Sequence, residues 1–265
     1  MQSICDRIDR NWLITPADKK EFAYSQINER KVFEKMKKDW AKKLLAILLP
    51  AIITFGVNMF AYMVPKQIVS PSRYVYLDME IDRLIPFVPW FVIFYYLAFA
   101  QWANYFLQAC FGDKKLRNRF FSADIVAKVI IFIMFMSWPL AVERPAVNPN
   151  NSIWEWMLSF TYGVDNPLGA FPSIHCFYSW MAFRYSFEAE PKERKWISWL
   201  QLLMSLAVFA STVFVKQHYF IDILGGIVFA EVALQIAGHS GLSAFGGRMF
   251  ERVCGKIYSD KSEIE

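Results

Sequence analysis

The chain has 265 residues, of which 55% are hydrophobic and only 20% are charged, and its formal net charge is +5. Soluble domains carry about 25% charged residues, and the apolar residues here gather in blocks of about 20, the length of a membrane-spanning helix. This distribution excludes an ordinary soluble domain, and membrane topology explains the basic charge better than a nucleic-acid partner does. Three histidines, and four cysteines without a Cys-x-x-Cys spacing, argue against a zinc site.

The first 43 residues are polar and contain eleven lysine and arginine residues. They lack the apolar stretch behind a basic start that a cleavable signal peptide needs. Thr15 followed by Pro16 predicts the start of a helix. The apolar residues among the lysines that follow fit an amphipathic helix on an anionic membrane surface, and a solvated basic tail explains them equally well.

Six apolar stretches then predict an all-α fold, a six-transmembrane helical bundle over residues 44–240. We expect a kink at Pro50 in the first stretch. The fourth stretch is short and polar. It is counted as a span because only then do the basic residues around Lys192–Lys195 lie on the cytosolic side. The predicted spans are Leu44–Val64, Leu84–Phe111, Phe121–Val142, Pro172–Phe187, Trp196–Val215 and Tyr219–Gly238. Residues 241–265 are predicted to be a C-terminal tail.

The basic residues predict the orientation of this bundle. With six spans and a cytosolic N-terminus, 24 of the 29 lysine and arginine residues lie on the cytosolic side, as the positive-inside rule requires. Five or seven spans would destroy this asymmetry. We therefore expect both termini in the cytosol and a location in the cell membrane.

Ionisable residues at membrane depth usually mark a functional site, and two of the three segments of interest hold a histidine. Pro172-Ser173-Ile174-His175 opens the fourth span, where the free N–H groups of a helix N-terminus, with the Ser173 hydroxyl beside them, would bind an anion. His218 and Asp222 open the sixth span, and their spacing places them on one helix face. A carboxylate on one imidazole nitrogen leaves the other nitrogen free as a nucleophile.

The third segment is Glu143-Arg144-Pro145, after the third span. Each segment also has an ordinary explanation. Arg144 alone would be an interface anchor, the Ser173 segment a capped helix with a hydrogen-bonded histidine, and His218 with Asp222 an i, i+4 ion pair. Together, at the outer ends of three spans, they indicate a phosphate-binding catalytic site.

These motifs resemble those of the type-2 phosphatidic acid phosphatase superfamily, which has Lys then Arg-Pro, Pro-Ser-x-His, and Ser-Arg then His-x-x-x-Asp. The resemblance covers roughly residues 120–240. It implies that His218 is the nucleophile that forms a phosphohistidine, that Asp222 orients it, and that His175 is the acid and later the base. It also implies that Arg144, Ser173 and the N–H groups of Ile174 and His175 hold the phosphate oxygens, with no metal or other cofactor.

The chain departs from the family pattern at two positions. Ser137 stands where the family has its lysine, and Thr212 where it has the arginine of the third motif. Lys216, two residues before His218, is the candidate replacement for a missing phosphate-binding cation. The same losses resemble the branch that includes inositol-phosphoceramide synthase-like proteins, some of which transfer a head group.

Three functions remain open from the sequence. The first is hydrolysis of a lipid phosphate monoester or diphosphate at the outer face of the membrane, on a phospholipid or a polyprenyl phosphate. The second is head-group transfer to an alcohol, and the third is lipid binding by a catalytically degenerate relative. The loop Asn148–Ala170, with Trp154, Trp156, Asp165 and Asn166, either binds a head group or an acceptor, or is an ordinary interfacial loop. The lipid and the oligomeric state are not determined by the sequence.

Overall fold

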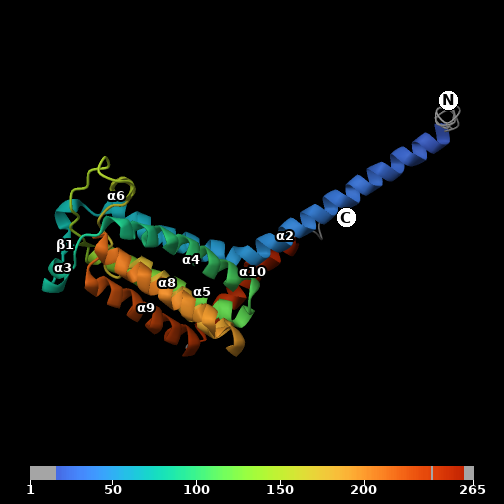
Figure 1. The fold of residues 1–265 in the computed structure, drawn as a ribbon. Coiled ribbons are helices and arrows are strands. Elements are labelled where there is room, and N and C mark those ends of the chain that lie inside the picture. The colour runs from blue at the N-terminus through green and yellow to red at the C-terminus, as the bar shows by residue number, and fades with distance from the viewer. Residues whose placement is uncertain (1–15, 240, 260–265) are drawn as a thin grey trace, which may run out of the picture. The chain divides into compact units, whose positions relative to one another are not determined.

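The computed structural model describes residues 16–239 and 241–259 (Figure 1). The chain divides into two compact units, residues 1–47 with 257–265, and residues 48–256. The described residues of the first unit are helical and belong to α2 (Pro16–Ile68) and to the end of α10 (Leu242–Ser259). The second unit contains the helical bundle.

The second unit is helical apart from two very short strands and the connecting loops. Its first element is the C-terminal part of α2, and its last is most of α10. Between them lie η2 (Pro71–Arg73), β1 (Val75–Tyr76), α3 (Glu80–Leu84), η3 (Pro89–Phe91), α4 (Val92–Phe111), α5 (Lys114–Ser137), β2 (Leu140–Ala141), α6 (Ile153–Val164), α7 (Ile174–Ala189), η4 (Lys192–Arg194), α8 (Lys195–Phe214) and α9 (Phe220–His239).

Four described segments are long and apolar enough to cross a membrane: Trp40–Ile68, Lys114–Ser137, Lys192–Phe214 and Phe220–His239. They correspond to the first, third, fifth and sixth predicted spans. The second predicted span corresponds to α4, which has 20 residues but includes Gln101, Asn104 and Gln108. The fourth corresponds to α7, which has only 16 residues. The chain is therefore a helical protein with four candidate spans, and the count of six stays a prediction.

Several boundaries differ from those expected. The second span was expected from Leu84, but α4 begins at Val92 after α3 and η3. The third was expected to reach Val142, but α5 ends at Ser137 and its chain enters β2. The expected loop 148–170 contains the helix α6, and the expected tail contains α10. A helix begins at Pro16 as predicted, whereas Thr15 lies outside the described residues.

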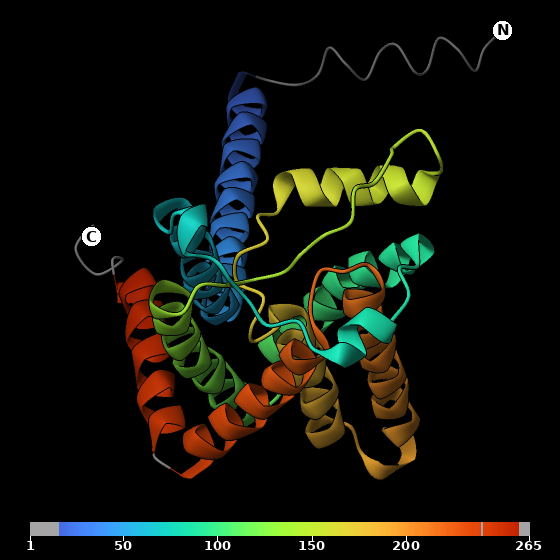
Figure 2. The same cartoon turned by 90° about the vertical axis from the view of Figure 1, so that its left-hand side faces the viewer.

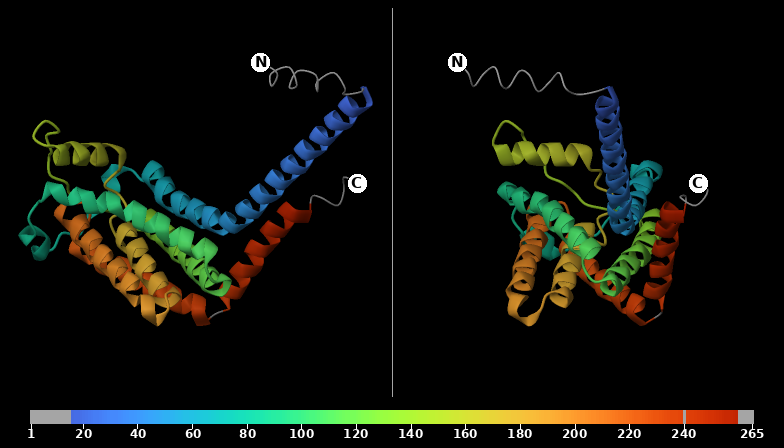
Figure 3. Two further views of the ribbon diagram at one scale, coloured as in Figure 1. Left: turned by 45° about the vertical axis from the view of Figure 1, so that its right-hand side comes forward. Right: turned by 90° about the vertical axis from the view of Figure 1, so that its right-hand side faces the viewer.

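The helix α7 is the central element of the bundle, packing against α4, α8 and α9. It joins α8 through a short turn at the end of the bundle opposite to α6 (Figure 3). The approach of α9 to α7 is close because α9 has glycine at position 226. A Cβ there would lie 2.7 Å from the carbonyl oxygen of Ser173 and 2.9 Å from the Cβ of Cys176. The packing therefore needs a residue without a side chain.

Short backbone pairings bring three loops together at the other end. The strands β1 and β2 pair in parallel, and Ala141 of β2 also bridges to Leu168. The carbonyl oxygen of Leu140 accepts hydrogen bonds from the N–H groups of Gly169 and Ala170. The helix α6 lies across this end of the bundle (Figure 2). The loops after α5 and before α7 are thus fixed beside each other.

Candidate active site

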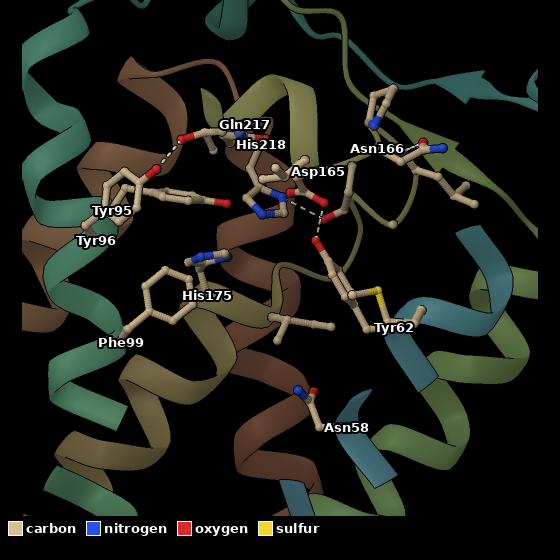
Figure 4. A pocket seen from close by; sticks show the side chains of 18 of the residues that line it. Asn58, Tyr62, Tyr95, Tyr96, Phe99, Asp165, Asn166, His175, Gln217 and His218 are labelled. Carbon is tan, nitrogen blue, oxygen red and sulfur yellow. Dashed lines mark hydrogen bonds between the residues drawn. The ribbon is translucent and has the colours of Figure 1, made fainter. Parts of the chain in front are cut away.

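A cavity of about 390 Å³ lies at the end of the bundle where α4, α7 and α9 begin. The close-up in Figure 4 shows two kinds of lining: polar side chains around the two imidazoles, and an aromatic wall on α4. The polar lining residues include Arg144, Asp165, Asn166, His175, Gln217 and His218. The apolar ones include Met59, Met63, Tyr95, Tyr96, Phe99, Trp102 and Phe160.

His218 is held in the turn between α8 and α9 by main-chain hydrogen bonds. Lys216 adopts the left-handed conformation (φ 50°) that commonly ends a helix. The His218 N–H then donates to the carbonyl oxygen of Thr212 (3.1 Å). At the start of α9, the N–H of Phe220 donates to Oδ1 of Asp82 (2.7 Å). Asp82, which belongs to α3, thus satisfies a free N–H group at the N-terminus of α9.

The tautomer of His218 follows from its two neighbours. Its Nδ1 lies 2.8 Å from the carbonyl oxygen of Ala170 and 3.3 Å from Oδ2 of Asp222. Because a carbonyl oxygen can only accept, Nδ1 carries the proton, and Nε2 keeps its lone pair in the neutral ring. Asp222 also accepts from the N–H of Tyr219 (2.8 Å) and is itself buried. The carboxylate expected to orient His218 therefore shares that task with a main-chain carbonyl.

His175 lies opposite His218 in the cavity, with ring centroids 6.1 Å apart. Its ring stacks on Tyr95 at 4.0 Å and packs against Trp102 at 4.9 Å. In the described part of the chain its Nε2 has no hydrogen-bond partner. The structure thus brings the two histidines, 43 positions apart in the sequence, into one cavity with their rings close to each other.

The N-terminus of α7 contributes main-chain donors at the same place. Ser173 caps the helix, since its Oγ accepts from the N–H of Cys176 (3.2 Å), and its own N–H donates to the carbonyl oxygen of Asp222 (3.1 Å). Ile174 and His175 line the cavity, and their N–H groups have no acceptor among the residues described. Ser173 is fully buried and is not among the lining residues. The structure therefore places the serine hydroxyl as a helix cap beside the cavity.

Arg144 enters the cavity from the loop after β2. One of its terminal nitrogens donates to the carbonyl oxygen of Asp165 (2.6 Å), and the other donates to Oε1 of Gln217 and lies 3.8 Å from the Asp165 carboxylate. Its guanidinium also packs over the ring of Tyr162. These contacts fix the orientation of the guanidinium, and its Nε has no partner among the described residues.

A second cation, Lys66 at the end of α2, lies beside Arg144. Lys66 is not itself among the cavity residues, but it forms a partly buried ion pair with Asp165, whose carboxylate also accepts a hydrogen bond from Tyr62. Burial alone would raise the pKa of the Asp165 carboxyl, but Lys66, Tyr62 and Arg144 together lower this pKa below its usual value. The carboxylate form of Asp165 is therefore favoured, and its charge partly neutralises the two cations.

Sequence reasoning counted Lys66 only as a topology charge, and it did not single out Tyr62, Tyr95 or Gln217. The signal available for Lys66 was a lysine at the outer end of a predicted span. The aromatic residues had no signal, because tyrosine is common at membrane interfaces.

Lys216 and the two departures from the family pattern lie elsewhere. The Nζ of Lys216 donates to the carbonyl oxygens of Asp82 (2.9 Å) and Ile85 (2.6 Å), and Lys216 is not among the cavity residues. Ser137 is exposed, and its hydroxyl donates a hydrogen bond to a main-chain carbonyl of its own helix. Thr212 is buried, and its hydroxyl likewise donates to a carbonyl of its own helix. The structure thus corrects the expectation that Lys216 replaces a missing cation: its ammonium group is already occupied by main-chain carbonyls.

A family model described as the PAP2 superfamily matches residues 84–236, more than half of the chain. The chain belongs to the PAP2 superfamily. This confirms the resemblance found in the sequence motifs. Members of this superfamily are generally phosphatases or related enzymes, so membership indicates a phosphatase or phosphotransferase type of activity. The apolar helices fit a lipid bilayer setting. No curated protein and no solved structure matched the chain.

Proposed function

We propose that this PAP2 protein hydrolyses a lipid phosphate monoester or diphosphate through a phosphohistidine, without a metal ion, at the outer face of the membrane. The observation that carries the proposal is the pair of imidazoles, 6.1 Å apart in one cavity, beside Arg144 and the N-terminus of α7. The outward-facing orientation rests on the distribution of lysine and arginine along the sequence.

In the first step, Nε2 of His218 attacks phosphorus and the bond to the lipid oxygen breaks. His175, in its protonated form, donates a proton to that leaving oxygen, and contacts with Tyr95 and Trp102 hold its ring in place for the transfer. In the second step, neutral His175 removes a proton from water, which attacks the phosphohistidine and releases phosphate. His218 is then regenerated.

Charge that develops on the phosphoryl oxygens faces fixed donors. These are the Arg144 guanidinium and the N–H groups of Ile174 and His175, aided by the dipole of α7. Asp222 and the carbonyl of Ala170 hold the Nδ1 side of His218, and Asp222 also stabilises the positive charge that the ring acquires. Ser173 positions the donors by capping the helix.

One observation favours head-group transfer as a second candidate. The family pattern has three cations in its motifs, whereas this site has Arg144 and Lys66 with Asp165 between them, a net charge of about +1. A phosphodiester carries one negative charge, and a phosphate monoester at neutral pH carries close to two. The weaker positive field is therefore better matched to a phosphodiester, whose head group an alcohol would accept.

The test is an assay of purified full-length protein in detergent with excess chelator and a panel of labelled phospholipids and polyprenyl phosphates. Phosphate release that disappears in His218→Ala, with label trapped on the wild-type protein, is the expected result. Release only of a lipid-linked product when an alcohol is added would favour transfer. Absence of turnover and of trapped label across the panel would refute both enzymatic candidates.

A further inference from the structure

Asn58 is a buried amide on α2 that faces the cavity without a protein partner. It lies outside the residues matched by the family model, is only 4% exposed and lines the cavity. In the part of the chain that the structure describes, neither Oδ1 nor Nδ2 of its amide has a hydrogen-bond partner. Figure 4 shows Asn58 on the same helix as Tyr62 and further than Tyr62 from the two histidines.

The other polar side chains on this face of α2 are satisfied. Thr54, one turn before Asn58, donates to the carbonyl oxygen of Pro50 (2.8 Å), and Tyr62, one turn after it, donates to Asp165. An unpaired amide inside a membrane helix destabilises the protein and usually marks a functional position. Asn58 is therefore the one member of this stripe whose hydrogen-bonding capacity remains for a bound molecule.

The position of Asn58 fits the backbone of a lipid whose phosphate lies at His218. One helical turn is about 5.4 Å, so the backbone of Asn58 lies roughly that far along α2 from the backbone of Tyr62, whose side chain extends to Asp165 at the histidine end of the cavity. Glycerolipids and ceramide lipids carry an ester or amide carbonyl a few bonds below the phosphate. Polyprenyl phosphates carry only hydrocarbon there, which would leave the Nδ2–H group of Asn58 unpaired.

We propose that Asn58 binds the backbone carbonyl of the lipid, with its Nδ2–H donating to an ester or amide oxygen. Met59 and Met63 then contact the first carbons of the acyl chain, because they lie on the same helix and line the same cavity. The inference rests on the proposed function only in taking the ligand to be a lipid phosphate. It narrows the substrates to lipids with a carbonyl-bearing backbone.

The test measures binding, so that it does not depend on turnover. Full-length protein in detergent is titrated with three non-hydrolysable phosphonates of equal chain length: diacylglycerol, its dialkyl ether analogue, and a ceramide analogue. The wild type is expected to bind the diacyl compound at least tenfold more tightly than the dialkyl one. Asn58→Leu is expected to abolish this preference by weakening only the carbonyl-containing ligands. The matched control is Asn104→Leu, at an exposed asparagine of α4, which should keep the preference.

The affinities for the diacyl and dialkyl phosphonates are compared within the same variant. A smaller folded fraction therefore does not alter their ratio. If Asn58→Leu does not give a monodisperse protein, Asn58→Ala is read in the same way. A wild type that binds neither ligand or both equally, or an Asn58 variant that keeps the preference, would overturn the inference. The ceramide analogue distinguishes glycerolipids from ceramide lipids, because only its amide N–H group can also donate a hydrogen bond to Oδ1 of Asn58. Loss of turnover with the preference intact would refute the proposed function and leave this inference standing.

Discussion

Replacing Asp222 by asparagine tests which neighbour fixes the tautomer of His218, and so which ring nitrogen keeps the lone pair for the proposed attack on phosphorus. The carboxylate oxygen lies 3.3 Å from Nδ1, but the carbonyl oxygen of Ala170 is nearer, at 2.8 Å. In serine-protease triads the corresponding change costs about 10⁴-fold in rate because it forces the wrong tautomer. Here the Ala170 carbonyl keeps the proton on Nδ1 in the variant. The expected loss of rate therefore comes only from the missing electrostatic stabilisation of the positively charged His218 ring.

The size of this electrostatic stabilisation follows from the distance between the Asp222 carboxylate and Nδ1 of His218. Two unit charges 3.3 Å apart at an effective dielectric constant of about 20 interact by about 5 kcal/mol. If about half of the positive charge on the imidazole has developed in the transition state, the loss is about 2.5 kcal/mol, or roughly 70-fold in kcat. The asparagine oxygen can still accept from the Tyr219 N–H, so the start of α9 should persist.

The assay is single-turnover formation of the phosphohistidine from a labelled lipid phosphate, with thermal unfolding as the control for folding. A fall of 10⁴-fold or more in a folded variant would show that the Ala170 carbonyl does not fix the tautomer. An unchanged rate would show that Asp222 does not stabilise the charged ring. Either result would refute the reasoning.

Two other substitutions test the site and the packing that forms it. Arg144→Ala should lower kcat/KM at least about a hundredfold, because one preorganised charged donor contributes about 3 kcal/mol; an unchanged value in steady-state kinetics would remove Arg144 from the site. Gly226→Ala places a methyl group 2.7 Å from the carbonyl oxygen of Ser173, so α9 must move away from α7 and both the melting temperature and the activity should fall. The matched control is Gly163→Ala, where nothing lies within 4 Å of the new Cβ, and the idea fails if the two variants behave alike.

The family and the helical fold could be predicted from the sequence because their signals are local. The motifs around His175 and His218 each lie within a few consecutive residues, and the blocks of apolar residues mark helices wherever they occur. The helix boundaries were less well predicted. The polar residues of α4 and the shortness of α7 weaken their hydropathy signals, and α6 looked like a loop because it is short and preceded by Asn148-Pro149-Asn150-Asn151.

The sequence alone indicated the residues to which we assign the proposed chemistry, since residue type and spacing decide whether an imidazole can have a carboxylate partner on its own helix. Only the tertiary structure decided what surrounds those residues. The Ala170 carbonyl on His218, the aromatic rings on His175, and the ion pair of Lys66 with Asp165 all join segments distant in the chain. Such contacts depend on how helices rotate and approach one another. That approach is set by packing at positions such as Gly226, which short-range sequence patterns do not encode.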